Sequence, residues 1–579
     1  MGFTEKESML LGLIDEKQLM DYTENLCKEV RLSGTEEELR SFEYTKKVLE
    51  GFGLKPELTF EEAYISLPRN AKLNVDGVDY KAITHAMSVN TPPEGVSAGI
   101  VYVKKGGKEE YAGKDLTGKF ALVDGLAIGG IVRTAQQAGA AGIIFINAEY
   151  THEMIASVVW GSPTPYTIDL LPKIPMVSVT YELGEKIKKQ LTEKPGLSAQ
   201  MHNEVETKWR KIPCLTATIE GNEEKDKYIL FSGHIDSWHY GAMDNGTANA
   251  GQLEVARILS QQKGLLKRSL RLAFWSGHSH GRYAGSTIYC DTHYEDLYDN
   301  CFLHVNIDSL GAKGSSVLTE GNTMRETKDL AATAIKQVAN QDFEGARFGR
   351  SGDQSFWGTG TPSVFMGLSE QPPMSGVAAE AFATLFGGSK AGGFGWWWHT
   401  TEDLMDKIDP QNLKRDVSIY LMVIYRALTD DILPINHVAA ISEIKQSVDN
   451  YNKMAGGKLD FAQSIARAQK LEELTKKIFS ALPAIKDSKQ KAVANEYIME
   501  LARVLVPLNY VKGSCFEHDL AWRQAVMPML EEIETLKDTA KGSDEEKMLI
   551  ALLRRRINGV NFALRKGIAL SEQTLEKLG

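Results

Sequence analysis

Short apolar runs alternate with helix-like segments between residues 206 and 435, and this alternation constrains the fold more than any other feature of the sequence. Each run is long enough for one buried strand, and the segments between the runs, such as Leu330–Ala339, carry apolar residues at helical spacing. Strands that alternate with helices in this way are typical of an α/β sheet flanked by helices. The apolar runs are Tyr228–Phe231, Leu270–Trp275, Leu303–Ile307 and Ser363–Met366.

The first 60 residues are predicted to be mainly helical. Lys17–Val30 and Thr35–Phe52 carry apolar residues at helical spacing. Thr35 with Glu38 resembles a capping box, which marks the start of the second helix. A strand is expected to begin within Leu54–Phe60.

Residues 65–205 show a different residue pattern, with short β-rich runs separated by Gly, Pro and Asn turns. Strands are predicted at Ala98–Lys104 and Gly118–Asp124, followed by a helix over Ile128–Ala141 and a buried strand over Gly142–Asn147. This βαβ-like insert has no cluster of metal-ligating side chains. We interpret it either as a lid or substrate-access domain or as an inert spacer.

Residues 436–579 are predicted to form a helical domain, because long stretches show helical spacing and many Glu/Lys pairs. Pro528 lies inside the third stretch and should kink or split it, since proline lacks the backbone N–H that a helix needs. The stretches are Phe461–Phe479, Asp487–Leu505, Leu520–Thr539 and Glu545–Leu564.

Length, charge and cysteine content narrow the class of protein. A chain of 579 residues is expected to form more than one domain. The net charge of −10, without a Lys/Arg block, gives no support for nucleic-acid binding. No run approaches the ~20 apolar residues of a membrane span. The N-terminus lacks the pattern of a signal peptide and the five cysteines are scattered without CxxC spacing, so we expect a reduced, cytoplasmic setting.

Histidines and aspartates gather where the predicted strands end. His234 and Asp236 directly follow the first apolar run, Asp244 lies in the Gly- and Asn-rich turn after them, and Asp308 and His399 occur further along. Ligands commonly lie at the ends of strands in α/β sheets, and His with Asp suits zinc or another divalent ion at an open, catalytic-type site. Taken singly, each residue also fits a hydrogen-bonded histidine, a turn or a helix cap.

These motifs resemble the dizinc aminopeptidase and carboxypeptidase family, M28, and most closely the branch that contains glutamate carboxypeptidase II and the transferrin receptor. The branch carries H-x-D-S-W-x-x-G-x-x-D, which here is met by His234 to Trp238, then Gly241 and Asp244. The order of parts is also similar. The resemblance implies a metallohydrolase domain over 1–64 and 206–435, an inserted protease-associated domain over 65–205 and a helical domain over 436–579.

The resemblance also implies roles for the candidate residues. His234 would bind one metal, Asp244 would bridge two, Asp308 would complete the first site and His399 the second. Asp236 would support His234 from behind. The implied function is hydrolysis of an amide or peptide C–N bond by a metal-activated water, with one or two zinc ions or another divalent metal. A short peptide or small molecule is the implied substrate, no membrane or nucleic-acid partner is expected, and relatives suggest a homodimer through the helical domain.

One motif departs from the family, which carries a Glu-Glu pair whose first Glu is the general base and whose second is a metal ligand. Here the corresponding stretch reads GHSHGRYAGS. An alignment on Gly285-Ser286 puts Ser279 at the base position and His280 at the ligand position. An alignment on Gly281 puts His278 at the base position and Ser279 at the ligand position. We prefer the first, because histidine replaces a ligand carboxylate better than serine does.

Either alignment leaves the site without its usual carboxylate base, and general acid–base catalysis is typically worth about 10²–10⁴-fold. His278 is our candidate substitute acid or base, with a purely structural histidine as the alternative. A histidine in place of a carboxylate also removes one negative charge, so we predict weaker dimetal occupancy and a single metal. The residues predicted for catalysis are therefore Asp236, His278 and Ser279.

Three functions fit the sequence. The first is a metallohydrolase with an altered base and a non-peptide, small-molecule substrate. The second is a non-catalytic relative that keeps the fold for binding, and the third is an ordinary aminopeptidase with a substituted base. The retention of His234, Asp236, Asp244, Asp308 and His399 favours an enzyme. The triplet Trp396–Trp398 is predicted either to wall an apolar pocket or to pack beneath the loop.

Overall fold

A single continuous sheet runs through the computed structural model, which describes residues 2–373 and 392–579. In these residues eleven strands are joined in the order β11-β10-β8-β9-β7-β3-β4-β5-β6, with β1 paired to β7 and β2 paired to β1. The half nearest the predicted site consists of β7 (Ser198–Ile219), β8 (Glu224–His234), β9 (Arg268–Trp275), β10 (Cys301–Asn306) and β11 (Ser363–Val364). The predicted apolar runs therefore coincide with strands of this half.

Strands β8, β9 and β10 are parallel, so their carboxyl ends meet at one edge of the sheet. His234 pairs with Trp275 between β8 and β9, and Ser232 pairs with Asn306 between β8 and β10. Alternate residues of β8 point to opposite faces, because side chains of a strand have a period of two. Ile229 and Phe231 join the main core, whereas Tyr228 and Leu230 join a second cluster. Both faces of this strand are buried.

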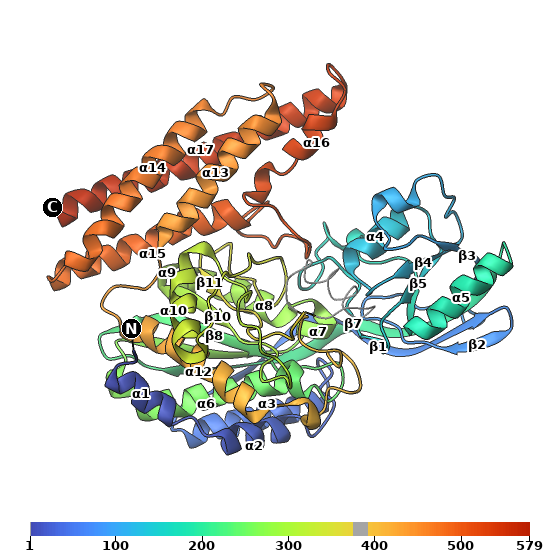
Figure 1. Ribbon diagram of the computed structural model, residues 1–579, viewed down its shortest axis with the longest axis horizontal. Coiled ribbons are helices and arrows are strands. Elements are labelled where there is room, and N and C mark those ends of the chain that lie inside the picture. Colours follow the sequence, from blue (N-terminus) through green and yellow to red (C-terminus); the bar gives the residue numbers. More distant parts are fainter. Residues whose placement is uncertain (1, 374–391) are drawn as a thin grey trace.

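Helices cover both faces of this half of the sheet (Figure 1). One face carries α2, α3, α6 and α12, with α1 at its margin, and the opposite face carries α8 and α9. The bounds are α1 (Glu5–Gly12), α2 (Glu16–Leu26), α3 (Glu36–Gly51), α6 (Ala248–Gln261), α8 (Ala284–Thr292), α9 (Tyr294–Asn300), α10 (Lys328–Ala339) and α12 (Pro410–Thr429). The fold class predicted from the alternation of strands and helices is confirmed.

Two long antiparallel strands lead out of this domain into the insert. β1 (Glu57–Val75) pairs with β7 along nearly its whole length, for example Ile65 with Lys208. The boundaries predicted at 65 and 205 thus fall inside continuous strands, which carry the insert as two arms. The insert itself comprises β2 (Val78–Lys81), β3 (Val96–Tyr102), β4 (Phe120–Asp124), α4 (Gly129–Gln137), β5 (Gly142–Ile146), β6 (Met176–Val179) and α5 (Tyr181–Glu193).

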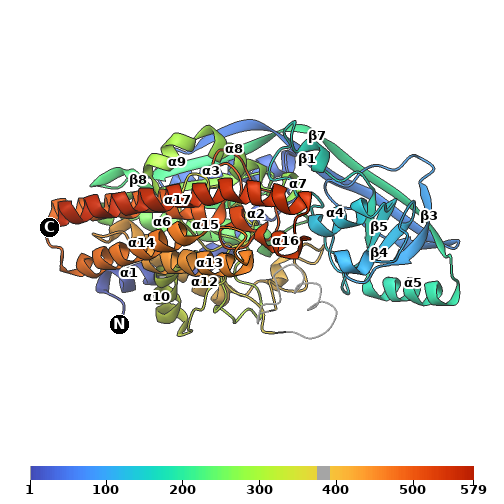
Figure 2. The ribbon, with the colours of Figure 1, turned by 90° about the horizontal axis from the view of Figure 1, so that it is seen from above.

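The C-terminal region is a bundle of long helices that lies beside the sheet domain (Figures 1 and 2). It contains α13 (His437–Ala455), α14 (Ala462–Ala481), α15 (Ser488–Tyr510), α16 (Ile533–Asp538) and α17 (Asp544–Leu578). The predicted helix over 520–539 is replaced by a 3-10 turn at Pro528–Leu530 and the short α16. Met527 precedes Pro528 in a left-handed conformation, φ 54°, so no helix runs through this point.

In the described part of the chain, no helix combines the length and the apolar character needed to cross a membrane.

The loop that follows β8 is held from below by a buried arginine. Arg31 is 1% exposed and its guanidinium donates to the main-chain oxygens of Ile235, at 2.8 Å, and of Gly241, at 3.0 Å. It also donates to the oxygens of Tyr240 and Leu26. A planar guanidinium with five donors is suited to tie several carbonyl groups together. The stretch from 235 to 241, which carries Asp236, therefore depends on this one side chain.

Replacement of Arg31 by Met is expected to lower the free energy of unfolding by about 3–5 kcal/mol, because several buried carbonyl groups lose their donor. The midpoint of urea unfolding measures this loss. Arg40→Met is the matched control, since Arg40 is 47% exposed and pairs with Glu29 at the surface. The control should unfold at nearly the wild-type urea concentration. Equal midpoints for the two variants would contradict the role given to Arg31.

Candidate metal centre

The predicted ligands converge at the carboxyl edge of β8, β9 and β10. His234 is the last residue of β8, and Asp308 follows β10 by two residues. Asp244 lies in the turn before α6, and His399 comes from the loop before α12. The imidazoles of His234 and His399 and the carboxylates of Asp244 and Asp308 all lie within the protein, with side-chain exposures between 2% and 11%.

Asp244 lies between two imidazoles. Its Oδ1 is 3.3 Å from Nε2 of His234, and its Oδ2 is 3.0 Å from Nε2 of His399. Nε2 of His234 also faces Oδ2 of Asp308, at 3.5 Å. Burial tends to raise the pKa of the Asp244 carboxyl, but the hydrogen bonds and charges of the two histidines outweigh it and hold that pKa below its usual range. A carboxylate with one oxygen toward each imidazole has the arrangement of a bridging ligand.

Both imidazoles are oriented through their other nitrogen. Nδ1 of His234 lies 2.8 Å from the main-chain oxygen of Asp236, and Nδ1 of His399 lies 2.7 Å from that of Glu153. A hydrogen on each Nδ1 leaves the lone pair of Nε2 toward Asp244, as metal-binding histidines require. Nε2 of His234 is buried and has no hydrogen-bond partner among the described residues. A buried polar atom left without a partner here fits a divalent ion as the missing partner.

A second aspartate, Asp403, holds the loop that carries Asp244. Its carboxylate accepts the backbone N–H groups of Met243 and Asp244, both at 2.9 Å. Burial raises the pKa of Asp403 to about 7, although these two hydrogen bonds act in the opposite direction. Asp403 follows His399 by four residues, so one loop supplies both a candidate ligand and the clamp on another. Sequence reasoning missed this role; the proximity of Asp403 to His399 was the available signal.

The histidine brought to the site by GHSHG is His278. Its ring stacks on that of His234, with centroids 3.7 Å apart and planes 14° apart. Ligand atoms of His234, His278 and Asp308 lie within 4.8 Å of one another. Nδ1 of His278 is 2.8 Å from Oδ2 of Asp353, which is fully buried. Sequence reasoning missed this contact.

His280, our predicted ligand, lies outside the group of His234, His278 and Asp308, and its Nε2 is buried without a hydrogen-bond partner among the described residues. Its Nδ1 lies 2.9 Å from the hydroxyl of Ser33 and its ring packs on Trp238. The physical reason is the short helix α7 (His278–Gly281), where residues two apart point about 200° away from each other. Only one of the two histidines can face His234, and it is His278. Of the two alignments, the one anchored on Gly281 agrees with this placement.

Asp236 organises the start of α7. Its Oδ2 accepts the hydroxyl of Ser33 at 2.6 Å and the backbone N–H of Ser279 at 2.8 Å, and its Oδ1 accepts the backbone N–H of His278 at 3.3 Å. Burial acts to raise the pKa of Asp236, yet the neighbouring histidines keep it well below its usual range. Asp236 therefore supports both His234 and His278. Ser279 contributes its main chain to this network, and its hydroxyl is a weak base.

Aromatic side chains enclose the His399 end of the site. Nε1 of Trp238 donates to Nε2 of His399 at 3.1 Å, and the ring of Trp398 stacks on His399 with centroids 3.4 Å apart. Trp397 and Trp398 are buried, so they pack beneath the loop. Trp396 stacks on Tyr150 of the insert. Among the described residues, Asp244 is the only one whose carboxylate forms an ion pair with His399.

The insert takes part in building the site. His399 receives main-chain contacts from Glu153, and Arg282 donates to the main-chain oxygens of Ile155 and Ser157. These contacts fix the segment 153–157 against both α7 and the His399 loop. The insert is thus fastened to the site and does more than space two parts of the chain.

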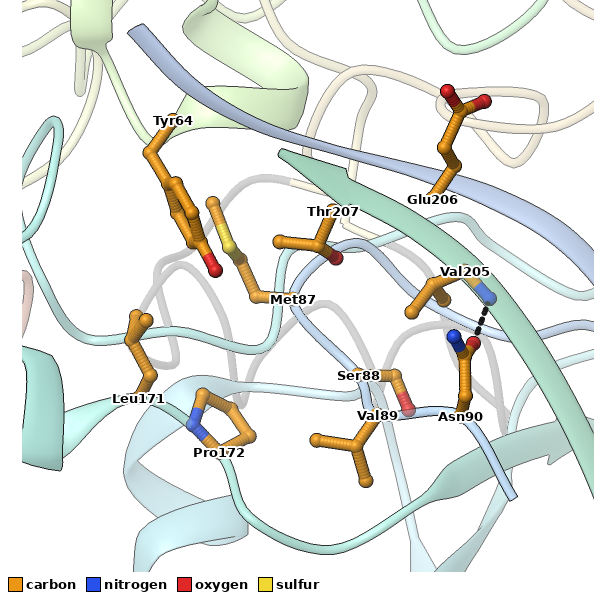
Figure 3. Close-up of a pocket in the computed structure, with 10 residues that line it drawn as sticks. All are labelled: Tyr64, Met87, Ser88, Val89, Asn90, Leu171, Pro172, Val205, Glu206 and Thr207. Atoms are coloured by element: carbon orange, nitrogen blue, oxygen red, sulfur yellow. Dashed lines mark hydrogen bonds between the residues drawn. The ribbon is translucent and has the colours of Figure 1, made fainter. Parts of the chain in front are cut away.

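A cavity of about 430 Å³ lies where the two arms meet the insert (Figure 3). Tyr64, Met87 and Leu171 line it, and the same three residues pack with Trp238, which contacts His399. Glu206 also lines the cavity but is paired with Arg69, Lys208 and Arg210. The cavity is therefore next to the candidate metal centre and separated from it by an apolar layer. None of the predicted ligands lines it.

Comparisons with known proteins agree with this geometry. Residues 215–424 match the model of Peptidase family M28, and residues 94–187 match the PA domain. The chain is similar to "Probable glutamate carboxypeptidase VP8" from Zea mays, with 27% identity over 250 residues, which cover 42% of this chain and 34% of that protein. The chain spans between 34% and 44% of the length of the first curated relatives that it matches.

Solved structures show the same fold. An aminopeptidase from Aneurinibacillus sp. strain AM-1 aligns with a TM-score of 0.54 and 23% identity, covering 73% of this chain and 96% of that one. A zinc aminopeptidase from Bacillus subtilis aligns with a TM-score of 0.55 and 19% identity, covering 72% and 96%. The matched segment 215–424 contains His234, Asp244, His278, Asp308 and His399. This segment therefore resembles Peptidase family M28, and the segment that matches the PA domain precedes it.

Proposed function

We propose that the protein is a metal-dependent hydrolase of an amide or peptide-type bond that works with a single ion. The observation that carries the proposal is the convergence of three buried groups on one point: Nε2 of His234, which makes no hydrogen bond of regular geometry, and the carboxylates of Asp244 and Asp308. Three ligand groups that converge on a buried point leave an open position for water or substrate, as catalytic zinc sites do. The match of residues 215–424 to a peptidase family model supports the same reaction class.

His234, Asp244 and Asp308 are the residues that would hold the ion, and zinc is the ion we propose. When bound, zinc acts as a Lewis acid that polarises a carbonyl group and makes water more acidic. Two aspartates balance the charge of one divalent ion. His399 would hold a second ion only together with Asp244, because its remaining contacts are with Trp238 and with the main chain of Glu153. A single ion therefore suits this set of side chains.

His278 is proposed as the general base in place of the carboxylate that the family uses. It lies against His234 at the edge of the ligand group, and Asp353 accepts a hydrogen bond from its Nδ1. A carboxylate on one nitrogen fixes the ring and stabilises its protonated form, so the other nitrogen can accept a proton from the attacking water. Asp236 orients the same residue by accepting its backbone N–H. The pair of His278 and Asp353 supplies the function that the missing glutamate would have.

The substrates that we propose follow from the relatives and from the altered base. Short peptides, aminoacyl compounds, and N-acyl or N-carbamoyl amino acids all contain the C–N bond that such a site would cleave. A screen of these four classes with the purified, zinc-loaded protein tests the proposal. Turnover that disappears on chelation supports it. No turnover of any class by a fully loaded protein would instead favour a binding function.

Removal of His234 should remove the ion. His234→Ala is expected to lower the zinc content of the purified protein by one equivalent, because the only neutral nitrogen donor of the proposed set is lost. Elemental analysis after gel filtration measures the content. His280→Ala is the control, since His280 contacts Ser33 and Trp238 and not the proposed ligands. A loss that is as large in His280→Ala as in His234→Ala would overturn the assignment.

Replacement of His278 distinguishes between two roles for this residue, general base and metal ligand. His278→Gln is expected to lower kcat by about 10²–10⁴-fold and to leave the zinc content unchanged, because a base acts in the chemical step. Asp353→Asn should lower kcat in the same direction but by less, since the imidazole remains. The measurement is steady-state kinetics joined to elemental analysis of each variant. Loss of zinc in His278→Gln would make His278 a ligand instead.

A further inference from the structure

A second group of metal-ligating side chains lies away from the candidate metal centre. Ligand atoms of Cys290, Asp291 and His518 lie within 4.8 Å of one another. Nε2 of His518 is 2.9 Å from Oδ1 of Asp291. Cys290 is a free thiol and 2% exposed. A thiol, an imidazole and a carboxylate together form a donor set that zinc accepts readily.

The group sits at the edge of a small cavity that a second cysteine also lines. Cys515 borders this cavity together with Cys290, Asp291 and His518, and it too is a free thiol. The carboxylate of Asp291 is 56% exposed, so the group can exchange ions with solvent. An ion pair between His518 and Asp291 explains the contact of those two residues. It does not explain why two free cysteines border the same cavity.

The residues come from two parts of the fold that are far apart in sequence. Cys290 and Asp291 lie at the end of α8 in the M28 domain, whereas Cys515 and His518 lie in the segment between α15 and α16. That segment is shaped independently of the group, because Asp519 accepts the backbone N–H groups of Lys512 and Gly513. Two of the donors are therefore presented by a helix and two by a turn with its own hydrogen bonds.

We propose that Cys290, Asp291 and His518 form a second metal site, that the ion is zinc, and that binding draws in Cys515, which lines the same cavity but lies outside the group of three, as the fourth ligand. Four protein ligands with sulfur among them are typical of a structural zinc site, not of a catalytic one. Zinc binds cysteine as the thiolate, so binding at this group would release the proton of the Cys290 thiol. The ion would fasten the segment 511–527 to α8 and thereby the helical region to the M28 domain.

The site lies close to the loop that carries Asp353. Arg350 and Ser355, on either side of Asp353, line the same cavity as the proposed ligands. Arg350 donates to the main-chain oxygen of Asp519, the residue after His518. Ser355 contacts the hydroxyl of Ser286 in α8, at 2.9 Å. These two contacts of the loop thus come from the 511–527 segment and from α8, which are the two elements that the proposed ion would join.

Cobalt substitution of the full-length protein tests the proposal, because a thiolate bound to Co²⁺ gives a charge-transfer band in the near ultraviolet. The candidate metal centre contains no cysteine, so only the proposed second site produces this band. The chain is stripped of metal under reducing conditions and titrated with Co²⁺. The wild type is expected to show the band, and Asp244→Asn, which alters the first centre, should keep it.

Cys290→Ser and His518→Ala should each abolish the band or reduce it several-fold, and each should lower the zinc content by one equivalent. Cys214→Ser and His293→Ala are the matched controls, since both residues lie outside the group. Circular dichroism of every variant checks folding, and His518→Ala carries the test if Cys290→Ser does not fold. Absence of the band in the reduced wild type, or its persistence in both His518→Ala and Cys290→Ser, would overturn the proposal. So would a Cys290–Cys515 disulfide that forms in preference to metal binding.

Discussion

The candidate metal centre depends on one buried carboxylate, that of Asp244. A charge in the interior is costly unless it is paired and hydrogen-bonded. Asp244 faces an imidazole on each side, and its backbone is held by Asp403. Arg31 fixes the preceding turn through main-chain carbonyls. Three parts of the chain therefore meet at Asp244. They are the end of β8 with His234, the N-terminal segment with Arg31, and the loop before α12 with His399 and Asp403.

Much of this arrangement was predictable from the sequence. His234, Asp244 and Asp308 follow apolar runs, and parallel strands bring their carboxyl ends to one edge, so local pattern and sheet geometry suffice. The choice between His278 and His280 depended on the four-residue helix α7, which the sequence pattern did not predict. The partners Asp353 and Glu153 come from loops distant in sequence. Their contacts arise from tertiary packing, which periodicity and spacing do not encode.

The chemistry of the site follows from which carboxylates are present and which are missing. Asp244 and Asp308 give the His234 side two negative charges, which balance one divalent ion. The His399 side shares Asp244 and is otherwise enclosed by Trp238 and Trp398. For the single ion that we propose, charge balance therefore favours the His234 side. In the function that we propose, an imidazole with a buried aspartate beside it supplies a proton acceptor without adding a third negative charge to the ligand group.

The other parts of the chain act on this site through the loop that precedes β11. Nδ1 of His278 contacts Asp353, and the loop that carries Asp353 makes hydrogen bonds with four other parts of the chain. Arg350 reaches the 511–527 segment, Ser355 contacts Ser286 in α8 and Trp160 of the insert, and Arg503 of α15 donates to the main-chain oxygen of Gly360. If His278 is the base, as we propose, small shifts of this loop would weaken catalysis, since a base must lie within hydrogen-bond distance of the proton it accepts. The insert and the helical region therefore help to position His278 through the Asp353 loop, although, in the part of the chain that the structure describes, none of their side chains hydrogen-bonds to His278.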